Sequence, residues 1–498
     1  MENNVRGSFK VNFNGSTIDN LVGQFMEENG VDGLALSIVQ APYISRVVNY
    51  GSAGVNLNGE KLVSGNTVFP IGKISQGYMA IAVMQAYEEG LLDLNDPITK
   101  FFKGADQIFS SITIKNLLQH TSGLVDFTKL STYNLYNSYE KIDILRMILG
   151  HLPVFDVNTK IARNPSNFYL LSLIIDHVTK MPYEEYVTKN QFERLRLKNT
   201  FFAKDKQAKE IQENLAEIKK HENFKHDMNF IDGYEFAASQ DKNAYLDLNL
   251  RGYSDVYASA YEISFWDIAL AGTILVKEAN NRKFIYSSFN LNGQEYNASC
   301  GWQFTRSKGF MDIYDNEAGY TTYLSRFTAP EDLVCVTILT TKGGLHVTEL
   351  ARQIAACFKT DLSIAANQND FISVESHLPA QLTYEKLRKL ILSKKNTIFA
   401  EIDHQKNAKG ANLELGFSKV VVFGNPVAGT HLMQEHPWMA TLLPLSISVY
   451  EDLNKNVWVS CDNISSFADK YQLQNKKEVL KNIKNVVNEI INKATSVY

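Results

Sequence analysis

The sequence predicts an α/β (α+β) protein with a large domain, in which an antiparallel sheet is flanked by helices and a helical region, followed by a small α+β domain. The chain has 498 residues, of which 45% are hydrophobic and 21% charged. This balance is typical of globular proteins, and the length exceeds one ordinary domain. The early part of the chain alternates helical and strand-like patterns. A polar stretch late in the chain separates these patterns from a second, shorter set.

The first elements are a helix and a hairpin. Residues 18–28 carry apolar side chains at helical spacing. Residues 33–40 and 44–55 read as paired strands with a short turn around Pro42. We therefore expect the large domain to begin with a helix and two antiparallel strands.

Residues 67–94 are the stretch around which the large domain is organised. An aromatic and aliphatic run ends at Gly72, and a helical pattern begins at once. Apolar side chains occupy one face of this helix, and Gln85, Glu88 and Glu89 fill the other. A strand that turns directly into a helix is a common mount for an enzyme nucleophile, because the helix N-terminus offers free N–H groups and a positive dipole end.

This stretch resembles the F-x-I-G-S-x-S-K segment of the serine β-lactamase, penicillin-binding protein and esterase superfamily, in particular its class C β-lactamase-related members. In that family the first Ser is acylated and the Lys one turn later helps to take its proton, since positions i and i+3 share a helix face. Aligned through residues 69–72, this chain has Lys73 at the nucleophile position and Gln76 at the position of the Lys. Ser75 keeps the intermediate position.

The resemblance covers about residues 15–358. The segment ITIKNLLQHTSGL, at residues 112–124, fits a framework signature of the family without interruption. The histidine of that signature is structural in the family, so we expect His120 to be packed and hydrogen-bonded rather than a catalytic base. Residues 170–202 and 257–275 match further framework helices.

The second motif of the family, Tyr-x-Asn, is replaced. Counted back from Leu170 and Leu171, its Tyr falls on Arg163 and its Asn on Pro165. A slip of two residues offers the amide of Asn167 but no Tyr. The resemblance therefore implies that the phenol base is absent.

The third motif, His/Lys-x-Gly, is replaced as well. In the family it precedes a Gly-aromatic-x-Ser/Thr turn, which residues 319–322 fit. The motif then falls on Ile313, Tyr314 and Asp315, which include neither a basic residue nor a glycine. Residues 333–358 read as a central strand and a closing helix.

Composition predicts four segments. The large domain spans residues 1–358 and includes a lysine- and glutamate-rich insertion at 203–251. A polar linker, residues 359–379, leads to the α+β domain at residues 380–474, and an amphipathic helix at 475–498 ends the chain. No spacing in these segments is diagnostic of a metal site, and no cofactor is expected.

The α+β domain resembles the family catalogued as domain of unknown function 302. The matching motifs are I-D-H at residues 402–404, F-G-N-P at 423–426 and L-P-L at 443–445. That family carries no assigned reaction. Some of its polar residues could form a ligand or metal cluster, although ordinary turn and cap roles are the simpler interpretation. These candidates are Asp403, His404, Asn425, His431 and His436.

The C-terminal helix carries an apolar stripe. Its members are Val479, Ile483, Val486, Ile490 and Ala494. Docking of this stripe onto the preceding domain is the simpler interpretation. Self-association through a helix pair is the alternative.

Charge, targeting signals and cysteines limit the protein class. The net charge is -4, so no overall field favours nucleic acid. No segment has signal-peptide character and no run approaches a membrane span. The chain has 4 cysteines and no C-x-x-C pair, which fits a reducing compartment. We expect a cytoplasmic protein, with export lacking a cleaved signal as the alternative.

These observations favour a pseudohydrolase, a β-lactamase-like fold that binds or scaffolds, with the small domain contributing ligand or partner binding. The alternative is an active serine hydrolase of esterase, peptidase or β-lactamase type, with displaced residues such as Ser75. The candidate binding residues of the large domain are Lys73, Ser75, Arg163, Asp315 and Tyr320.

Lys73 and Arg163 face the same cavity if the fold is kept. Two positive charges about 4 Å apart repel by roughly 4 kcal/mol at an effective dielectric constant of about 20. Compensation could come from internal pairing with an acid, from a small anionic ligand, or from side chains that reach solvent. The acids in reach are Asp312, Asp315 and Glu317.

Overall fold

The computed structural model of the chain contains two compact units. The large unit comprises residues 1–293, 298–302 and 311–358, and the small unit comprises residues 294–297, 303–310 and 359–498. The described residues are 12–13, 15–40, 43–56, 59–102, 105, 107–202, 230–231, 234–241, 247, 249–305, 310–316, 319–327, 333–359, 362, 371–471 and 473–498. Most of the predicted insertion at 203–251 lies outside them.

An eight-stranded sheet forms the centre of the large unit. Its order is β13-β14-β15-β16-β17-β3-β4-β5, and β16, β17, β3 and β4 pair antiparallel. Strands β16 and β17 are buried along their whole length, so the sheet is covered on both faces. The strands are β13 (Ala298–Ser299), β14 (Trp302–Phe304), β15 (Phe310–Asp315), β16 (Thr321–Phe327), β17 (Val334–Thr340), β3 (Gly33–Gln40), β4 (Tyr43–Asn56) and β5 (Gly59–Leu62).

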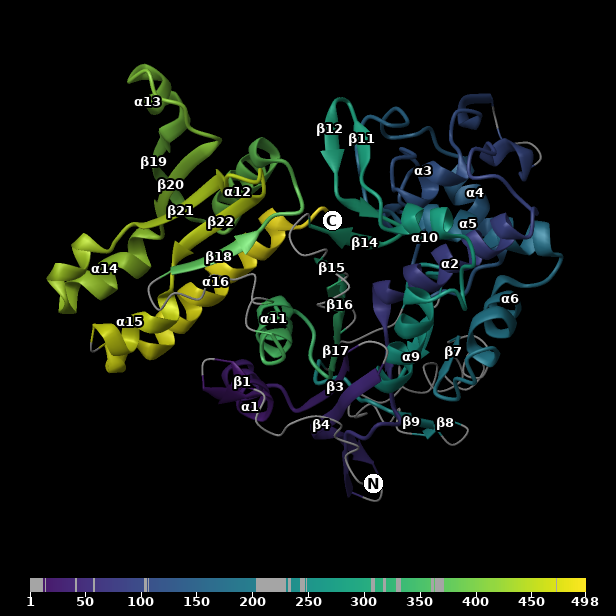
Figure 1. Cartoon of the computed structure of the whole chain (residues 1–498), viewed down its shortest axis with the longest axis horizontal. Coiled ribbons are helices and arrows are strands. Elements are labelled where there is room, and N and C mark those ends of the chain that lie inside the picture. Colours follow the sequence, from purple (N-terminus) through teal and green to yellow (C-terminus); the bar gives the residue numbers. More distant parts are fainter. Residues whose placement is uncertain are drawn as a thin grey trace. The chain divides into compact units, whose positions relative to one another are not determined.

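Helices cover the two faces of this sheet. Helices α1 (Ile18–Asn29) and α11 (Thr348–Ala356) lie on one side, and α9 (Ala260–Ala271) lies on the other (Figure 1). The hydroxyl of Ser264 on α9 donates to that of Ser37 on β3 at 2.6 Å. The expected helix and hairpin at the start of the chain, and the central strand and closing helix near residues 333–358, are all present.

The stretch from strand to helix has the expected order. Strand β6 (Thr67–Pro70) leads into a 3₁₀ turn, η1 (Gly72–Ile74), and then into α2 (Ser75–Glu88). The polar side chains expected on the second face of α2 do not all reach solvent, because residues 75–86 are all buried. Gln85 is satisfied inside the protein, where its Nε2 donates to the carbonyl of Leu275 at 3.0 Å.

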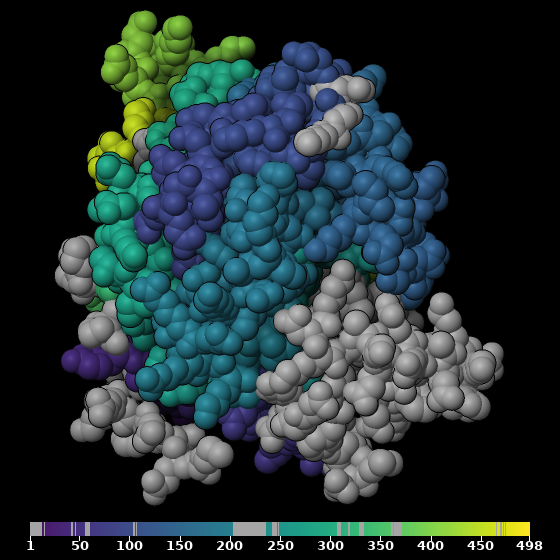
Figure 2. All heavy atoms as spheres, turned by 90° about the vertical axis from the view of Figure 1, so that its right-hand side faces the viewer, coloured from purple at the N-terminus to yellow at the C-terminus, as the bar shows by residue number. Residues whose placement is uncertain are grey.

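A helical region packs against α2 and accounts for this burial. Helix α5 packs on both α2 and α3. In Figure 2 this region, coloured blue, forms most of the face turned to the viewer. The helices are α3 (Ile114–Leu118), α4 (Lys141–Leu149), α5 (Pro165–Thr179), α6 (Tyr183–Val187) and the π-helical turn η5 (Thr188–Glu193).

A second, five-stranded sheet lies beside α2, with the order β7-β10-β6-β9-β8. Strand β10 pairs antiparallel with both β6 and β7. Its strands besides β6 are β7 (Thr200–Phe202), β8 (Phe230–Ile231), β9 (Tyr234–Phe236) and β10 (Val256–Ala258). The shorter elements of the chain are β1 (Asn12–Phe13), β2 (Ser16–Thr17), η2 (Ile98–Lys100), η3 (Gln107–Phe109), η4 (Phe127–Lys129), α10 (Ala279–Ile285), β11 (Phe289–Leu291) and β12 (Gln294–Tyr296).

The small unit is a five-stranded antiparallel sheet with helices packed on it. The strand order is β18-β22-β21-β20-β19. The strands are β18 (Phe371–Glu375), β19 (Thr397–Asp403), β20 (Ser418–Gly424), β21 (Leu445–Glu451) and β22 (Val457–Asp462). The helices are α12 (Ala380–Ser393), α13 (His404–Gly410), α14 (Pro426–Glu435), η9 (Pro437–Thr441), α15 (Ile464–Lys470), η10 (Gln474–Lys476) and α16 (Lys477–Thr495).

The ends of the small unit differ from the expected segments. Strand β18 lies inside the stretch expected to be a linker, 359–379, and pairs with β22 along its length. The apolar stripe of α16 packs into the core of the small unit, in contact with α12, α15 and β18. The stripe is therefore covered by its own unit, as the docking interpretation predicts. Among the described residues, no helix is long and apolar enough to span a membrane.

We expect Ile490→Ala in α16 to lower the stability of the small unit. Ile490 is fully buried in the core, and truncation of a buried Ile to Ala costs about 2–5 kcal/mol. Hydrogen exchange of peptides from β20 to β22 in the full chain measures this loss. The control is Lys481→Ala on the exposed side of the same helix, which should leave exchange unchanged. Equal exchange in both variants would contradict the packing of α16.

Candidate functional site

A buried ion pair occupies the position where the family nucleophile is expected. The Nζ atom of Lys73 in η1 lies 2.9 Å from Oδ1 of Asp315 at the end of β15. The two side chains are 10% and 7% exposed. The backbone N–H of Lys73 donates to Asp315 Oδ2 at 3.0 Å, and that of Asn316 donates to Oδ1 at 2.9 Å. Both carboxylate oxygens are therefore held.

Gly72 permits this close approach. Its φ is 53°, in the left-handed region, and an added Cβ would lie 2.3 Å from Asp315 Oδ2. The preceding residue, Ile71, is held by strand β16, because Thr322 Oγ1 donates to its carbonyl at 3.0 Å. The turn between β6 and α2 is thus shaped around the carboxylate.

Of the acids expected to pair with Lys73, Asp315 does so and Asp312 does not. Asp312 lies on the opposite face of β15, where its Oδ2 accepts a hydrogen bond from the hydroxyl of Tyr323 at 2.9 Å. Glu317 lies outside the described residues. The alternation of side chains along a strand explains why residues 312 and 315 diverge.

A chain of polar side chains runs from Gln76 into the helical region. Ser122 donates to Asn167 Oδ1 at 2.5 Å, and Asn167 Nδ2 contacts His120 Nδ1 at 3.0 Å. His120 Nε2 then contacts Gln76 Oε1 at 3.2 Å. Gln76 is fully buried, and within the described part of the chain its Nε2 has no hydrogen-bond partner. Gln76, at the position of the family Lys, is thus bound into the framework.

His120 has the packed, hydrogen-bonded role expected of it. Its Nδ1 accepts from the backbone N–H of Asn164 at 3.4 Å and from Asn167, so the ring proton is on Nε2 and is donated to Gln76. Burial holds the pKa of His120 well below its ordinary value, and the charge of Arg163 lowers that pKa further. His120 is therefore neutral and has both nitrogens engaged.

The hydroxyl of Ser75 is turned toward β10. Its Oγ accepts a hydrogen bond from the backbone N–H of Val256 at 3.1 Å, and the residue is fully buried. Lys73 lies in the 3₁₀ turn before α2, so the side-chain directions of an α-helix do not by themselves separate it from Ser75. The burial of Ser75 is the stronger obstacle to its use as a nucleophile.

The remaining motif positions have structural roles. Pro165 is the first residue of α5, with Asn164 as the N-cap that accepts from Ser166 N–H at 2.8 Å. Tyr320 is buried and donates to the carbonyl of Ala237 at 2.9 Å, and burial raises the pKa of its phenol above the usual range. Ile313 is buried.

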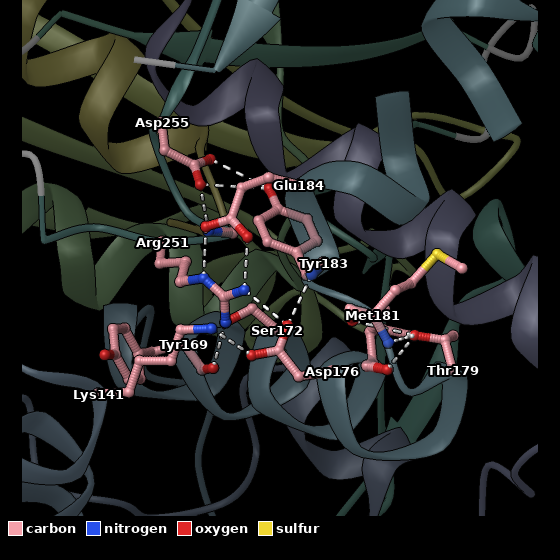
Figure 3. A network of polar contacts seen from close by, with 12 residues as sticks. Lys141, Tyr169, Ser172, Asp176, Thr179, Met181, Tyr183, Glu184, Arg251 and Asp255 are labelled. Carbon is pink, nitrogen blue, oxygen red and sulfur yellow. Dashed lines mark hydrogen bonds and ion pairs between the residues drawn. The ribbon is translucent and has the colours of Figure 1, made fainter. Parts of the chain in front are cut away.

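A second network, which the sequence analysis did not identify, is centred on Arg251 (Figure 3). Arg251 is 1% exposed and donates to both carboxylate oxygens of Glu184, at 2.7 and 2.6 Å. It also donates to Asp176 at 2.7 Å and to Ser172 at 2.9 Å. Bidentate Arg–carboxylate pairs fix geometry strongly, so this network ties α5 and α6 to the segment that leads into β10.

Asp255 connects this network with the segment that binds Ser75. It accepts from the backbone N–H of Gly252 at 2.9 Å and from the hydroxyl of Tyr183 at 3.2 Å. Burial raises the pKa of Asp255 to about 7. The next residue in the chain is Val256, whose N–H holds Ser75. The sequence around Arg251 and Asp255 contains no motif that predicts this network.

The candidate residues of the small unit are not brought together. Asp403 and Asn425 are N-caps, of α13 and α14 respectively. His404 on α13 and His431 on α14 are exposed, and these helices lie at different ends of the small unit (Figure 1). His436 follows α14, with its ring 6.1 Å from that of Trp438. Across the described ranges, no group of three or more His, Cys, Asp or Glu could hold a metal ion.

Two families match the chain. The beta-lactamase family matches residues 18–356. The domain of unknown function DUF302 matches residues 372–490. The second match includes β18 and most of α16, in agreement with the sheet and core of the small unit.

Individual proteins are similar over parts of the chain. Protein flp of Staphylococcus aureus (strain MW2) is 27% identical over 193 residues, which is 37% of this chain and 38% of flp. The crystal structure of D-amino acid amidase from Ochrobactrum anthropi SV3 complexed with L-phenylalanine has a TM-score of 0.54 at 16% identity, over 69% of this chain and 98% of the amidase. An octameric penicillin-binding protein homologue from Pyrococcus abyssi has a TM-score of 0.54 at 16% identity, over 89% of each chain. The structural similarities concern the fold.

We expect Lys73→Met to destabilise the large unit by about 3–5 kcal/mol, because it leaves the buried carboxylate of Asp315 without its partner charge. The control is Lys129→Met, which removes a lysine that is 79% exposed in its pair with Asp126 and should cost about 0–1 kcal/mol. Urea unfolding followed by circular dichroism measures both. Similar small losses in the two variants would contradict a buried, coupled pair.

We expect Asp255→Asn to change how stability depends on pH. The folded protein releases the proton of Asp255 near pH 7 and the unfolded chain near pH 4, so ionisation lowers the free energy of unfolding as pH rises between these values, by up to roughly 1.4 kcal/mol per pH unit. The free energy of unfolding of the variant minus that of the wild type should therefore increase from about pH 4 to about pH 7 and then level off. Parallel profiles of the variant and the wild type would refute the raised pKa.

Proposed function

The chain belongs to the beta-lactamase family, with a DUF302 domain after it, and from this premise we propose that it is a catalytically impaired member that binds rather than hydrolyses. The fold is that of a serine hydrolase-type superfamily. The observation that carries the proposal is the Lys73–Asp315 pair at the position of the nucleophile. An ammonium held by a carboxylate is not a nucleophile, since its lone pair carries a proton.

The loss of several groups at once supports this proposal. Acyl transfer by this family depends on a hydroxyl nucleophile and a nearby base. Removal of the nucleophile alone from a triad hydrolase costs on the order of 10⁶ in turnover. Here the nucleophile position is Lys73, the Lys position is Gln76 and the Tyr position is Arg163. Ser75, which lies between these positions, is fully buried.

The alternative function, hydrolysis with Ser75 as nucleophile, would require a change in the turn before α2. Ser75 would have to release Val256 and reach solvent, and a base would have to reach its hydroxyl. Since β6 and β10 pair beside this turn, such a change would disturb the second sheet. The observed hydrogen bond therefore argues for the binding function.

The small unit is proposed to contribute ligand or partner binding. Its sheet alternates, so that Ile447 and Val449 face the core while Ser448 and Tyr450 point to the other face. Ser448 and Tyr450 are partly exposed. A face with hydroxyl and aromatic side chains is suited to contacts with a polar partner.

We expect the protein to form no acyl adduct with a fluorescent penicillin or with a fluorophosphonate, because Ser75 is fully buried and its hydroxyl is bound to the N–H of Val256. Intact-protein mass spectrometry and gel fluorescence measure this, with an active class C β-lactamase as the positive control. A stoichiometric mass shift would overturn the proposal. Peptide mapping of the adduct would then distinguish Ser75 from a residue elsewhere.

A further inference from the structure

We propose that Asp255 is a pH-sensitive lock of the segment 249–256: as a neutral acid it holds the segment on α6, and as a carboxylate it is repelled by Glu184 and loosens the segment. The lock acts on the turn before α2, and it is independent of whether the protein binds or hydrolyses a ligand there. Its parts are the buried carboxyl group, the charged side chains around it (Figure 3) and the backbone of Val256.

The carboxyl group of Asp255 is held by neutral donors. Its Oδ2 accepts from the backbone N–H of Gly252 at 2.9 Å and from the hydroxyl of Tyr183 at 3.3 Å. Its Oδ1 lies 3.2 Å from the same hydroxyl. A proton on Oδ1 therefore leaves both bonds to Oδ2 in place. Among the described residues, no Lys, Arg or His forms an ion pair with Asp255.

Arg251, the cation of the same segment, is committed to other acids. Its Nε and Nη2 atoms donate to the two oxygens of Glu184, at 2.7 and 2.6 Å. Nη2 also donates to Asp176 at 2.7 Å, and Nη1 donates to Ser172 at 2.9 Å. In Figure 3 the guanidinium group accordingly lies between Glu184 and Asp176. These donors are therefore not available to neutralise a carboxylate at residue 255.

The charges of the network balance only when Asp255 is neutral. Arg251 and Lys141 supply two positive charges, and Asp176 and Glu184, with which they pair, supply two negative ones. Ionisation of Asp255 adds a third negative charge inside the protein, where a charge without a partner is costly. Burial, and then the charge of Glu184, raise the pKa of Asp255 to about 7. The carboxyl group therefore changes its charge close to neutral pH.

Val256 connects the lock with the turn before α2. Its N–H donates to the hydroxyl of Ser75 at 3.1 Å, and its carbonyl accepts from the N–H of Ile71 at 3.1 Å. Both backbone groups of the residue that follows Asp255 thus hold the turn. Loosening of the segment 249–256 releases these two bonds, and with them the hydroxyl of Ser75.

The test is hydrogen exchange of the full chain, measured by mass spectrometry from pH 6 to pH 8.5 with labelling times scaled for the intrinsic exchange rate. Asp255 releases its proton near pH 7 in the closed segment and near pH 4 in the open one. The closed form therefore loses stability as the pH rises toward 7, and the loss then levels off. Protection of peptides covering residues 249–258 and 68–76 should fall about tenfold between pH 6 and pH 8.5. Equal protection at both values would overturn the lock.

Low concentrations of urea separate local loosening from global unfolding. A local opening exposes little surface, so its exchange depends weakly on urea, whereas exchange through global unfolding depends on it steeply. At pH 8.5 we expect residues 249–258 to exchange faster than peptides of β16 and β17, with a weak dependence on urea. If all these peptides exchange at one rate with one urea dependence, the segment opens only with the whole unit and the lock is refuted.

Asp255→Asn is the variant that cannot ionise. It keeps an acceptor oxygen for the N–H of Gly252, so protection of residues 249–258 should be the same at pH 6 and pH 8.5. The matched control is Asp312→Asn, which replaces another buried acid of the large unit, one bonded to Tyr323, and which should keep the tenfold fall. A tenfold fall in Asp255→Asn, or its loss in Asp312→Asn, would assign the effect to another group.

If Asp255→Asn does not fold, Tyr183→Phe takes its place. This variant removes a hydroxyl that donates to the carboxylate, and so it disfavours the ionised form. The fall in protection should then extend to higher pH than in the wild type, and an unchanged midpoint would refute the lock. Neither result affects the test for an acyl adduct, by which the proposed function is judged separately.

Discussion

A buried ammonium has to be neutralised where it lies, and at the start of α2 the carboxylate of Asp315 neutralises Lys73. Much of the surrounding geometry serves this contact. Gly72 has no Cβ that would collide with the carboxylate, and Thr322 fixes the carbonyl of Ile71 beside it. Lys73 and Asp315, which are far apart in sequence, thus compensate each other's charge.

The polar side chains near this pair form a continuous network of hydrogen bonds. Ser122, Asn167, His120 and Gln76 form one hydrogen-bonded chain, which connects the helical region with α2. The side chain at the position of the family Lys is an amide, and the neutral ring of His120 donates a proton to it. This polar interior therefore stabilises the fold.

A network of buried charged side chains positions the segment that leads into β10. Arg251 holds Glu184 and Asp176, and Asp255 follows a few residues later, just before the strand that binds Ser75. These contacts fix the segment between the helices and β10. They also position Val256, whose N–H donates to the buried hydroxyl of Ser75.

In the small unit, Asp403 and Asn425 cap helices, and α16 completes the core.

The sequence by itself determined the local elements and the family, because apolar periodicity and framework motifs are local properties. It identified the positions of Lys73, Asp315 and Gln76, and it named Asp315 as one of three acids that could pair with Lys73. Only the tertiary structure showed that Asp315 pairs with Lys73 and that Asp312 does not, since the alternation of β15 turns Asp312 to the other face. It also decided that α2 is buried all round, that β18 belongs to the small sheet, and that Arg251 and Asp255 support the site. Those outcomes depend on which distant segments pack together, and the pattern of a single segment does not contain that information.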